Sequence, residues 1–229
     1  PASSAWQHSL DVGGAGAGAA LGAAGGALRA RTAYLAKDVS HVALVEVRGE
    51  NSAWSNNGDV HVGFAGRASL HVIDGGACDA QSVVIGGSFS AIGDAAVSGH
   101  AALLSAASRV VIGSGGVGTL LIDRGATCTA AYADLGAYVG AKGDARVTDA
   151  GSTLHVQQQI TVGGSAFSSK AGAGSLIVEN GGAVSVNRLI LAESPDGVAS
   201  VVVQDADTFI TAQDVVVGPQ LAPPASPSA

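Results

Sequence analysis

Short apolar runs closed by a small residue return at regular intervals along the chain. Two clear examples are Val83-Val84-Ile85-Gly86 and Val110-Val111-Ile112-Gly113. Such runs close at residues 63, 86, 113, 140, 163, 192 and 218, which lie between 23 and 29 residues apart. A second apolar run follows and ends in an acidic or amide residue and glycine, as in Ser175-Leu176-Ile177-Val178-Glu179-Asn180-Gly181. Because short β-type runs that end in turn residues are typical of strands, each unit is predicted to hold two or three strands.

A unit of this size cannot bury its own apolar face, so the units must stack on one another. None of them contains a helical period over ten residues. A narrow coil interior accepts Ala, Val, Leu and Ile, which are the residues that fill the runs. The sequence therefore predicts an all-β fold, a β-solenoid of about seven coils over residues 41–218. A β-propeller is the main alternative, but its blades need about 40 residues each.

The glycines that close the runs are predicted to form the corners of the coils, where φ is often positive. These corner residues are Gly63, Gly86, Gly113, Gly140, Gly163 and Gly218.

The two ends differ from the repeats. Residues 1–40 are rich in Gly and Ala and are predicted to form an arm or a cap on the first coil, partly helical or extended. The seven-residue spacing of Leu21, Leu28 and Leu35 favours a helix, whereas each glycine weakens one by about 1 kcal/mol. Residues 219–229 are rich in Pro and Ser and are expected to form an extended tail.

Composition and charge exclude several classes of protein. The chain has 229 residues, 11 Lys and Arg, and a net charge of −7. It lacks the basic footprint of a nucleic-acid-binding protein, and no apolar run reaches the 18 residues of a membrane span. The acidic balance, the few lysines and the abundance of small residues fit an exported bacterial protein, extracellular or on the cell surface. The absence of an initiator Met before Pro1 suggests a trimmed or excised segment.

No motif in the sequence predicts catalysis, a cofactor or a metal site. Residues 113–118 match the glycine fingerprint of dinucleotide-binding proteins, but a strand is predicted after them in place of the required helix. Asp205 and Asp207 share one face if they lie on a strand, and paired carboxylates on a β-helix could hydrolyse glycans. No second Asp pair or basic partner sits at the equivalent positions of neighbouring units, however. The six histidines fall in different units. We therefore expect that the chain is not an enzyme.

The two cysteines, Cys78 and Cys128, follow equivalent turns two units apart. Two coil steps separate their backbones by about 9–10 Å, whereas the Cα atoms of a disulfide lie within about 7 Å of each other. We therefore expect no intramolecular disulfide, while a cross-link between subunits remains open.

One set of motifs resembles a known repeat. Gly49-Glu50-Asn51-Ser52-Ala53-Trp54, the run ending in Val62-Gly63 and residues 66–76 follow the order Gly-x-x-Ser-x-Trp, Val-Gly, Gly-x-x-x-Leu-x-Val-x-x-Gly-Gly. In this order the chain resembles the repeat of type V secretion passengers and PEP-CTERM-associated exported proteins, over residues 42–218. The unit at 99–109 and the last unit depart from the pattern. The resemblance implies export, a right-handed parallel β-helix and a surface role, and it carries no catalytic residues.

Two functions are weighed on this basis. The first is an extracellular structural protein that self-associates, end to end or laterally, into a fibre, sheath or surface layer, because open solenoid ends pair with other chains. Val215-Val216-Val217 is a poor cap for the last coil. The alternative is an adhesin or spacer passenger of an autotransporter or anchored surface protein, which would bind a surface glycan or a host protein as a monomer.

Overall fold

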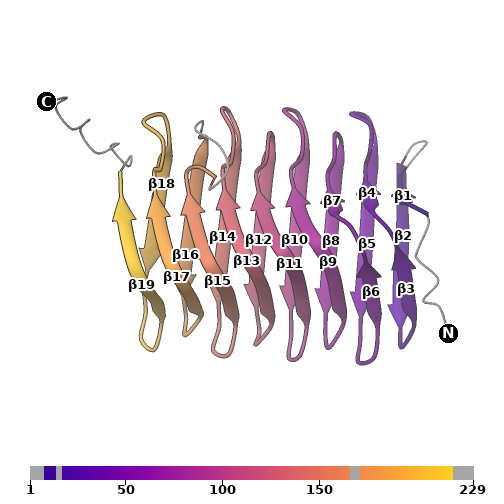
Figure 1. Cartoon of the computed structure of the whole chain (residues 1–229). Coiled ribbons are helices and arrows are strands. Elements are labelled where there is room, and N and C mark those ends of the chain that lie inside the picture. Colours follow the sequence, from indigo (N-terminus) through magenta and orange to yellow (C-terminus); the bar gives the residue numbers. More distant parts are fainter. Residues whose placement is uncertain (1–7, 14–16, 166–170, 219–229) are drawn as a thin grey trace, which may run out of the picture.

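The computed structural model describes residues 8–13, 17–165 and 171–218. This part of the chain contains 19 strands and no helix. The strands stack in parallel along one axis as a β-solenoid of eight coils, with the first and last described strands at opposite ends of the stack (Figure 1). The all-β solenoid predicted from the repeats is confirmed, with one coil more than expected.

One sheet supplies a single strand to each coil, and we call its outer face side 1. Its eight strands are β2 (Ala17–Ala24), β5 (Val42–Arg48), β8 (Arg67–Ile73), β10 (Ile92–Ser98), β12 (Val117–Asp123), β14 (Lys142–Thr148), β16 (Ala173–Glu179) and β18 (Val198–Val203). Each pairs in parallel with the strands of the neighbouring coils, and β2 and β18 are the two edge strands of this sheet.

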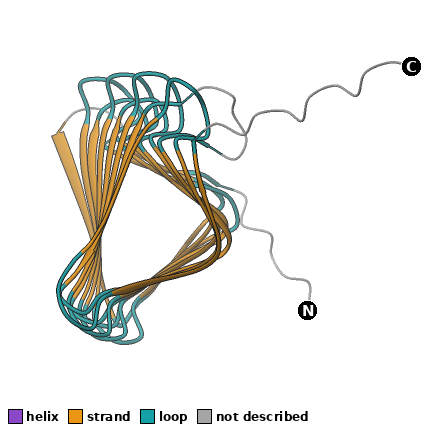
Figure 2. Cartoon of the chain, turned by 90° about the vertical axis from the view of Figure 1, so that its left-hand side faces the viewer, coloured by secondary structure: helices purple, strands orange, loops and turns teal. Residues whose placement is uncertain are grey.

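The second sheet is folded along its length, so that each coil is three-sided in cross-section (Figure 2). We call the outer face before the fold side 2 and the outer face after it side 3. In β11 the register shifts between Ala106 and Arg109, which is where the strand bends. The strands of this sheet are β1 (Leu10–Val12), β3 (Ala27–Ala30), β4 (Ala33–Leu35), β6 (Ala53–Asn56), β7 (Val60–Val62), β9 (Ala77–Ile85), β11 (Leu103–Ile112), β13 (Thr127–Leu135), β15 (Thr153–Val162), β17 (Ala183–Leu191) and β19 (Phe209–Val217).

Two kinds of coil alternate along the stack. In one kind the turn between sides 1 and 2 has three residues, as at 74–76 and 124–126, and the loop that leaves side 3 has six, as at 86–91. In the other kind the turn has four residues, as at 99–102, and the loop has four, as at 113–116. The bend between sides 2 and 3 is also one residue longer in β11 and β15 than in the strands beside them. The longer turn and bend are offset by the shorter loop, so both kinds close in 25 residues.

Backbone dihedrals follow the same alternation. The short turns have positive φ at their first and second residues, as at Asp74 and Gly75. The long turns have it at the first and third residues, as at Gly99 and Ala101. The structural repeat is therefore a pair of coils of 50 residues. This explains why the apolar runs are unevenly spaced in the sequence.

One coil departs from the 25-residue closure. Lys142 pairs with Ala173, so β16 begins 31 residues after β14. The extra residues lie in the loop at 163–172, which leaves side 3 between β15 and β16. An insertion here changes neither sheet, because the coil resumes the common register after it.

The core consists of ladders of inward-facing residues, one from each coil. On side 2 one ladder runs Leu28, Trp54, Cys78, Leu104, Cys128, Leu154, Val184, Ile210. Its members from Trp54 to Val184 are fully buried. The alternation of inward apolar and outward polar residues is what makes each strand bury one face only.

The Gly/Ala-rich N-terminal segment forms the first coil. Strands β2, β3 and β4 pair in parallel with β5, β6 and β7. The arm or cap expected over residues 1–40 is therefore corrected where the structure describes it, and no helix forms there. Residues 1–7 and the tail at 219–229 lie outside the described residues. The sequence did not predict this coil, because Ala and Gly contribute little to the alternating apolar pattern by which a strand is recognised.

The corner between side 3 and the following loop has positive φ in every coil. The residues at this position are Ala36, Gly63, Gly86, Gly113, Gly136, Gly163, Ala192 and Gly218. Gly136 takes the place expected for Gly140, which lies inside the six-residue loop at 136–141. The other five predicted glycines occupy the corner.

We predict that Gly113→Ala destabilises the fold more than Gly140→Ala does. Both glycines have positive φ, at 69° and 78°, which costs an L-residue about 1–2 kcal/mol. A Cβ on Gly113 would also lie 2.2 Å from the carbonyl oxygen of Lys142, whereas the nearest atom to a Cβ on Gly140 is a ring carbon of Phe89 at 3.7 Å. Urea unfolding should show a loss above about 3 kcal/mol for Gly113→Ala, and equal losses would contradict this account of the corner.

Candidate functional site

The last coil leaves its inward-facing residues uncovered. Val215 and Val217 pair with Leu189 and Leu191 of the coil before, but their exposed fractions are 61% and 77%, against 5% for Leu189. Val203 on β18 is likewise half exposed. The C-terminal face of the solenoid is therefore an apolar cross-section of the core, ringed by the unpaired edges of β18 and β19.

The two terminal coils carry opposite charge. The first coil, at 17–41, contains Arg29, Arg31 and Lys37 and one acidic residue, Asp38. Residues 198–218 contain Asp205, Asp207 and Asp214 and no basic residue. Lys37 Nζ lies 3.4 Å from a carboxylate oxygen of Asp11 on β1. The sequence showed these charges, but only the coil assignment places them at opposite ends of one rod.

The six-residue loops place apolar side chains on the edge between sides 3 and 1. Val39, Phe89 and Val139 occupy the same loop position two coils apart. Their exposed fractions are 71%, 86% and 59%. They form a broken apolar ridge along the rod, because the alternate coils have four-residue loops.

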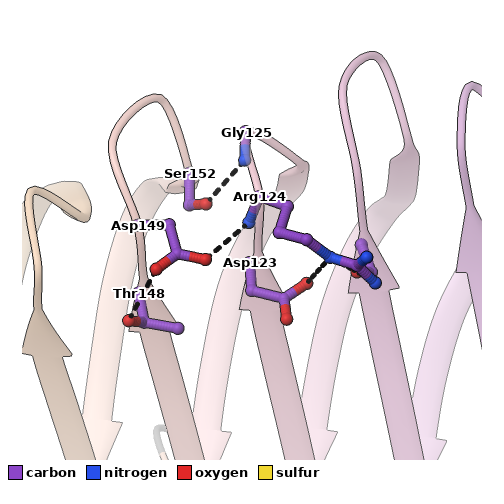
Figure 3. A network of polar contacts seen from close by, with 7 residues as sticks. Asp123, Arg124, Gly125, Thr148, Asp149 and Ser152 are labelled. Atoms are coloured by element: carbon purple, nitrogen blue, oxygen red, sulfur yellow. Dashed lines mark hydrogen bonds and ion pairs between the residues drawn. The ribbon is translucent and has the colours of Figure 1, made fainter.

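Side-chain hydrogen bonds join three of the four long turns to the short turn before them, as Figure 3 shows for one pair. The Gly125 N–H donates to Ser152 Oγ at 3.0 Å, and the Arg124 N–H donates to Asp149 Oδ2 at 3.2 Å. Thr148 Oγ1 donates in turn to Asp149 Oδ1. These bonds satisfy backbone donors of the strained short turn, so the turns are clamped in pairs.

The same clamp recurs at both ends of the stack. Gly25 N–H donates to Ser52 Oγ at 2.7 Å, and Gly181 N–H donates to Thr208 Oγ1 at 2.8 Å. Between the turns at 74–76 and 99–102 this bond is not formed, because Ala102 occupies the position where the other long turns have Ser or Thr. Ala102 belongs to the unit that fitted the repeat pattern poorly in the sequence.

The acidic pair considered for catalysis belongs to this clamp. Asp205 and Asp207 lie in the last long turn, both with positive φ. Asp205 Oδ2 accepts the N–H of Asn180 at 3.3 Å. They are turn residues, and the shared strand face that would align them for hydrolysis is not formed.

The cysteines lie inside the coils. Cys78 and Cys128 are free and fully buried, and Leu104 separates them in the side 2 ladder. Burial raises the pKa of both thiols, that of Cys128 to about 12. A disulfide to another subunit would require the coil to open, so we do not carry the cross-link into the proposed function.

The histidines lie in separate places. His61 stacks on Tyr34 with ring centroids 4.9 Å apart, and Phe64 meets both rings edge-on. Burial lowers the pKa of His61. Among the described residues no three His, Cys, Asp or Glu side chains gather as a metal site would require.

Comparison with known proteins gives no match to any family model, curated protein or solved structure. The similarity to the type V secretion and PEP-CTERM-associated repeat thus stays an expectation from sequence. The described residues include no helix that is long and apolar enough to cross a membrane.

The turn clamp predicts opposite effects of two substitutions at equivalent positions. Ser152→Ala should lower the free energy of unfolding by about 1 kcal/mol, because the partly buried N–H of Gly125 loses its acceptor. Ala102→Ser should raise it, because the new hydroxyl can accept the N–H of Gly75. Urea unfolding of both variants tests this, and a loss of stability in Ala102→Ser would show that the clamp is not transferable.

Burial of the thiols predicts that neither cysteine reacts in the folded chain. A thiolate is the reactive form, and both thiols are inaccessible and protonated at neutral pH. Ellman's reagent should therefore label no thiol in the native protein and two in about 6 M guanidinium. Rapid labelling of the native protein would place at least one cysteine outside the core.

Proposed function

We propose that the chain is an extracellular structural solenoid that self-associates end to end into a fibre, sheath or surface layer. The observation that carries the proposal is the uncovered apolar cross-section at β18 and β19. Burying it against the first coil of another copy would continue both sheets with parallel main-chain hydrogen bonds. The composition and the resemblance noted above support an extracellular location.

Two further features support this assembly. The positive N-terminal coil and the negative C-terminal coil would attract each other head to tail and would oppose head-to-head contact. The described stack also begins with a coil at 17–41 that has the six-residue loop and a turn of only two residues, and it ends with a long-turn coil at 198–218, so a head-to-tail junction keeps the alternation of turns. The apolar ridge of Val39, Phe89 and Val139 offers a second surface for lateral packing of rods.

Strand β1 must leave for a continuous junction to form. β1 lies next to β4 on side 3, one coil position before the first full coil. In a head-to-tail stack the second half of β19 from another copy would have to pair with β4 at that same position. β1 has only three residues and few bonds, among them Leu10 N–H to Thr32 O and Ala36 N–H to Val12 O. If β1 leaves, the ion pair between Lys37 and Asp11 breaks, and Lys37 can then interact with the acidic C-terminal coil of the other copy.

The alternative function is an adhesin or spacer passenger, which predicts isolated rods. A pocket of about 360 Å³ on side 3, lined among others by Ser82, Ser108 and Tyr138, is the observation that favours it.

Charge complementarity predicts that association depends on salt and on the terminal acids. Rods should lengthen with protein concentration at about 50 mM salt and shorten at about 1 M, where screening acts within about 3 Å. Asp207→Asn with Asp214→Asn should weaken association about tenfold, a loss of about 1.4 kcal/mol. Analytical ultracentrifugation and negative-stain microscopy measure both effects.

Asp74→Asn is the matched control, because Asp74 is an exposed turn residue with positive φ in the middle of the rod. It should leave association unchanged. Removing residues 1–12 should lower the concentration at which rods join, since β19 then meets no competitor. Rods of a single chain at every concentration, or equal association of the double variant, would overturn the proposed function.

A further inference from the structure

Side 2 carries two parallel rows of neutral polar side chains over the last three coils. Strands β15, β17 and β19 pair in register there, so His155, Ser185 and Thr211 face outward side by side. Two residues further along each strand lies a second row, which consists of Gln157, Asn187 and Gln213. The six side chains line a groove with a volume of about 190 Å³. Both rows run along the rod axis, with one member in each coil.

The second row is accessible and unpaired. Gln157, Asn187 and Gln213 are all exposed. Within the described part of the chain, none of their three side-chain amides forms a hydrogen bond. In the first row His155 Nδ1 and Ser185 Oγ share a hydrogen bond of 2.6 Å. Each amide of the second row offers two N–H donors and a carbonyl acceptor, so the row can bind a ligand without breaking a contact within the chain.

The charge of the lining selects among ligand classes. None of the described residues that line the groove is Lys, Arg, Asp or Glu. An ionic ligand would therefore lose water without gaining a counter-charge, and an apolar ligand would bury the amides unpaired, which is costly. Complementarity favours a neutral ligand with donors and acceptors along its whole length. Neutral glycans and the main chain of an extended peptide both have this property.

The spacing of the rows separates these two ligand classes. Neighbouring coils lie about 4.8 Å apart, so the amides recur at that interval along the groove. An extended peptide presents main-chain groups to one side at every second residue, about 6.6 Å apart, and falls out of phase with the row over three coils. A β-1,4-linked hexose is close to one coil step in length. An extended sugar chain can therefore meet one amide with each sugar.

An aromatic ring lies beside the groove at its C-terminal end. Phe209 precedes Thr211 by two residues on β19 and faces the same side. Its exposed fraction is 53%, and its neighbour in the register is the small residue Ala183. The negative face of an aromatic ring attracts the polarised C–H groups of a pyranose. Phe209 can therefore hold a sugar ring that also reaches Thr211.

We propose that side 2 of the last three coils binds an extended, neutral β-1,4-linked glycan, which lies along the rod axis over Gln157, Asn187 and Gln213. Polymers of glucose and of N-acetylglucosamine share this linkage and this lack of charge. The three amides lie outside the apolar end face of the rod, so the site is independent of end-to-end association.

Isothermal titration with cellohexaose and chitohexaose tests the proposal. Maltohexaose is the control for a curved, α-linked chain, and hexa-alanine is the control for a peptide. We expect at least one β-linked hexasaccharide to bind with a Kd below about 1 mM, and both controls to bind at least about tenfold more weakly. Because neutral groups make the contacts, the affinity should be equal at about 50 mM and about 1 M salt. It should stop rising at three or four sugars, since only three coils carry the amide row.

Substitutions in the amide row locate the site. Asn187→Ala, in the middle of the row, should weaken binding about tenfold. Gln81→Ala is the matched control and should bind as the parent does, because Gln81 is an exposed glutamine at the same bend of β9, next to Ala107 of the following coil. Ala131→Gln should strengthen the binding of longer chains, because Ala131 holds the same position on β13 and the row gains one coil.

Three outcomes would overturn the proposal: no β-linked hexasaccharide binding at about 10 mM, binding that survives Asn187→Ala, or equal binding of maltohexaose or hexa-alanine. If Asn187→Ala does not fold, Gln157→Ala takes its place in the test. Analytical ultracentrifugation measures rod association separately, and Asn187→Ala should associate as the parent does. Loss of glycan binding and loss of rod assembly are therefore distinguishable.

Discussion

The main-chain hydrogen bonds between successive coils are the constraint on which the whole structure depends. They run along all three sides, and on side 1 they hold each strand in register with the next, so every coil must close over the same path. A turn that is longer by one residue is tolerated only when the loop compensates. The alternation of coil types, the glycine corners and the clamped turns all follow from this requirement.

The same constraint explains where the chain can vary. An insertion inside a strand would shift the inward residues of that coil to the outside, whereas the loop at 163–172 accepts six residues with no change of register. Outward positions are also free, because their side chains leave the hydrogen bonds intact. Side 3 uses that freedom to place Asp134 and Arg109 beside valines. Function on such a rod therefore comes from outward ladders and loops, while the interior is restricted to small and aliphatic side chains.

The sequence was sufficient to predict the fold class, because apolar runs and glycine corners are local signals. It misplaced one corner for a specific reason. The strand that ends at Leu135 has Asp134 on its outer face, which breaks the apolar run, whereas Tyr138-Val139-Gly140 in the loop imitates one. The first coil was missed because its Ala and Gly residues are weak strand signals. The pocket on side 3 could not be predicted, since its residues come from several coils and meet only through the register.

Head-to-tail assembly would repeat every outward feature of the chain along one line. One chain contributes eight coils, about 38 Å of rod at the usual strand spacing. The apolar ridge of Val39, Phe89 and Val139 would therefore recur along a fibre at a fixed interval. Each lateral contact between two such fibres needs only modest affinity, because the second and later contacts form at high effective concentration. Growth end to end and packing side by side would then depend on each other, since longer rods offer more lateral contacts.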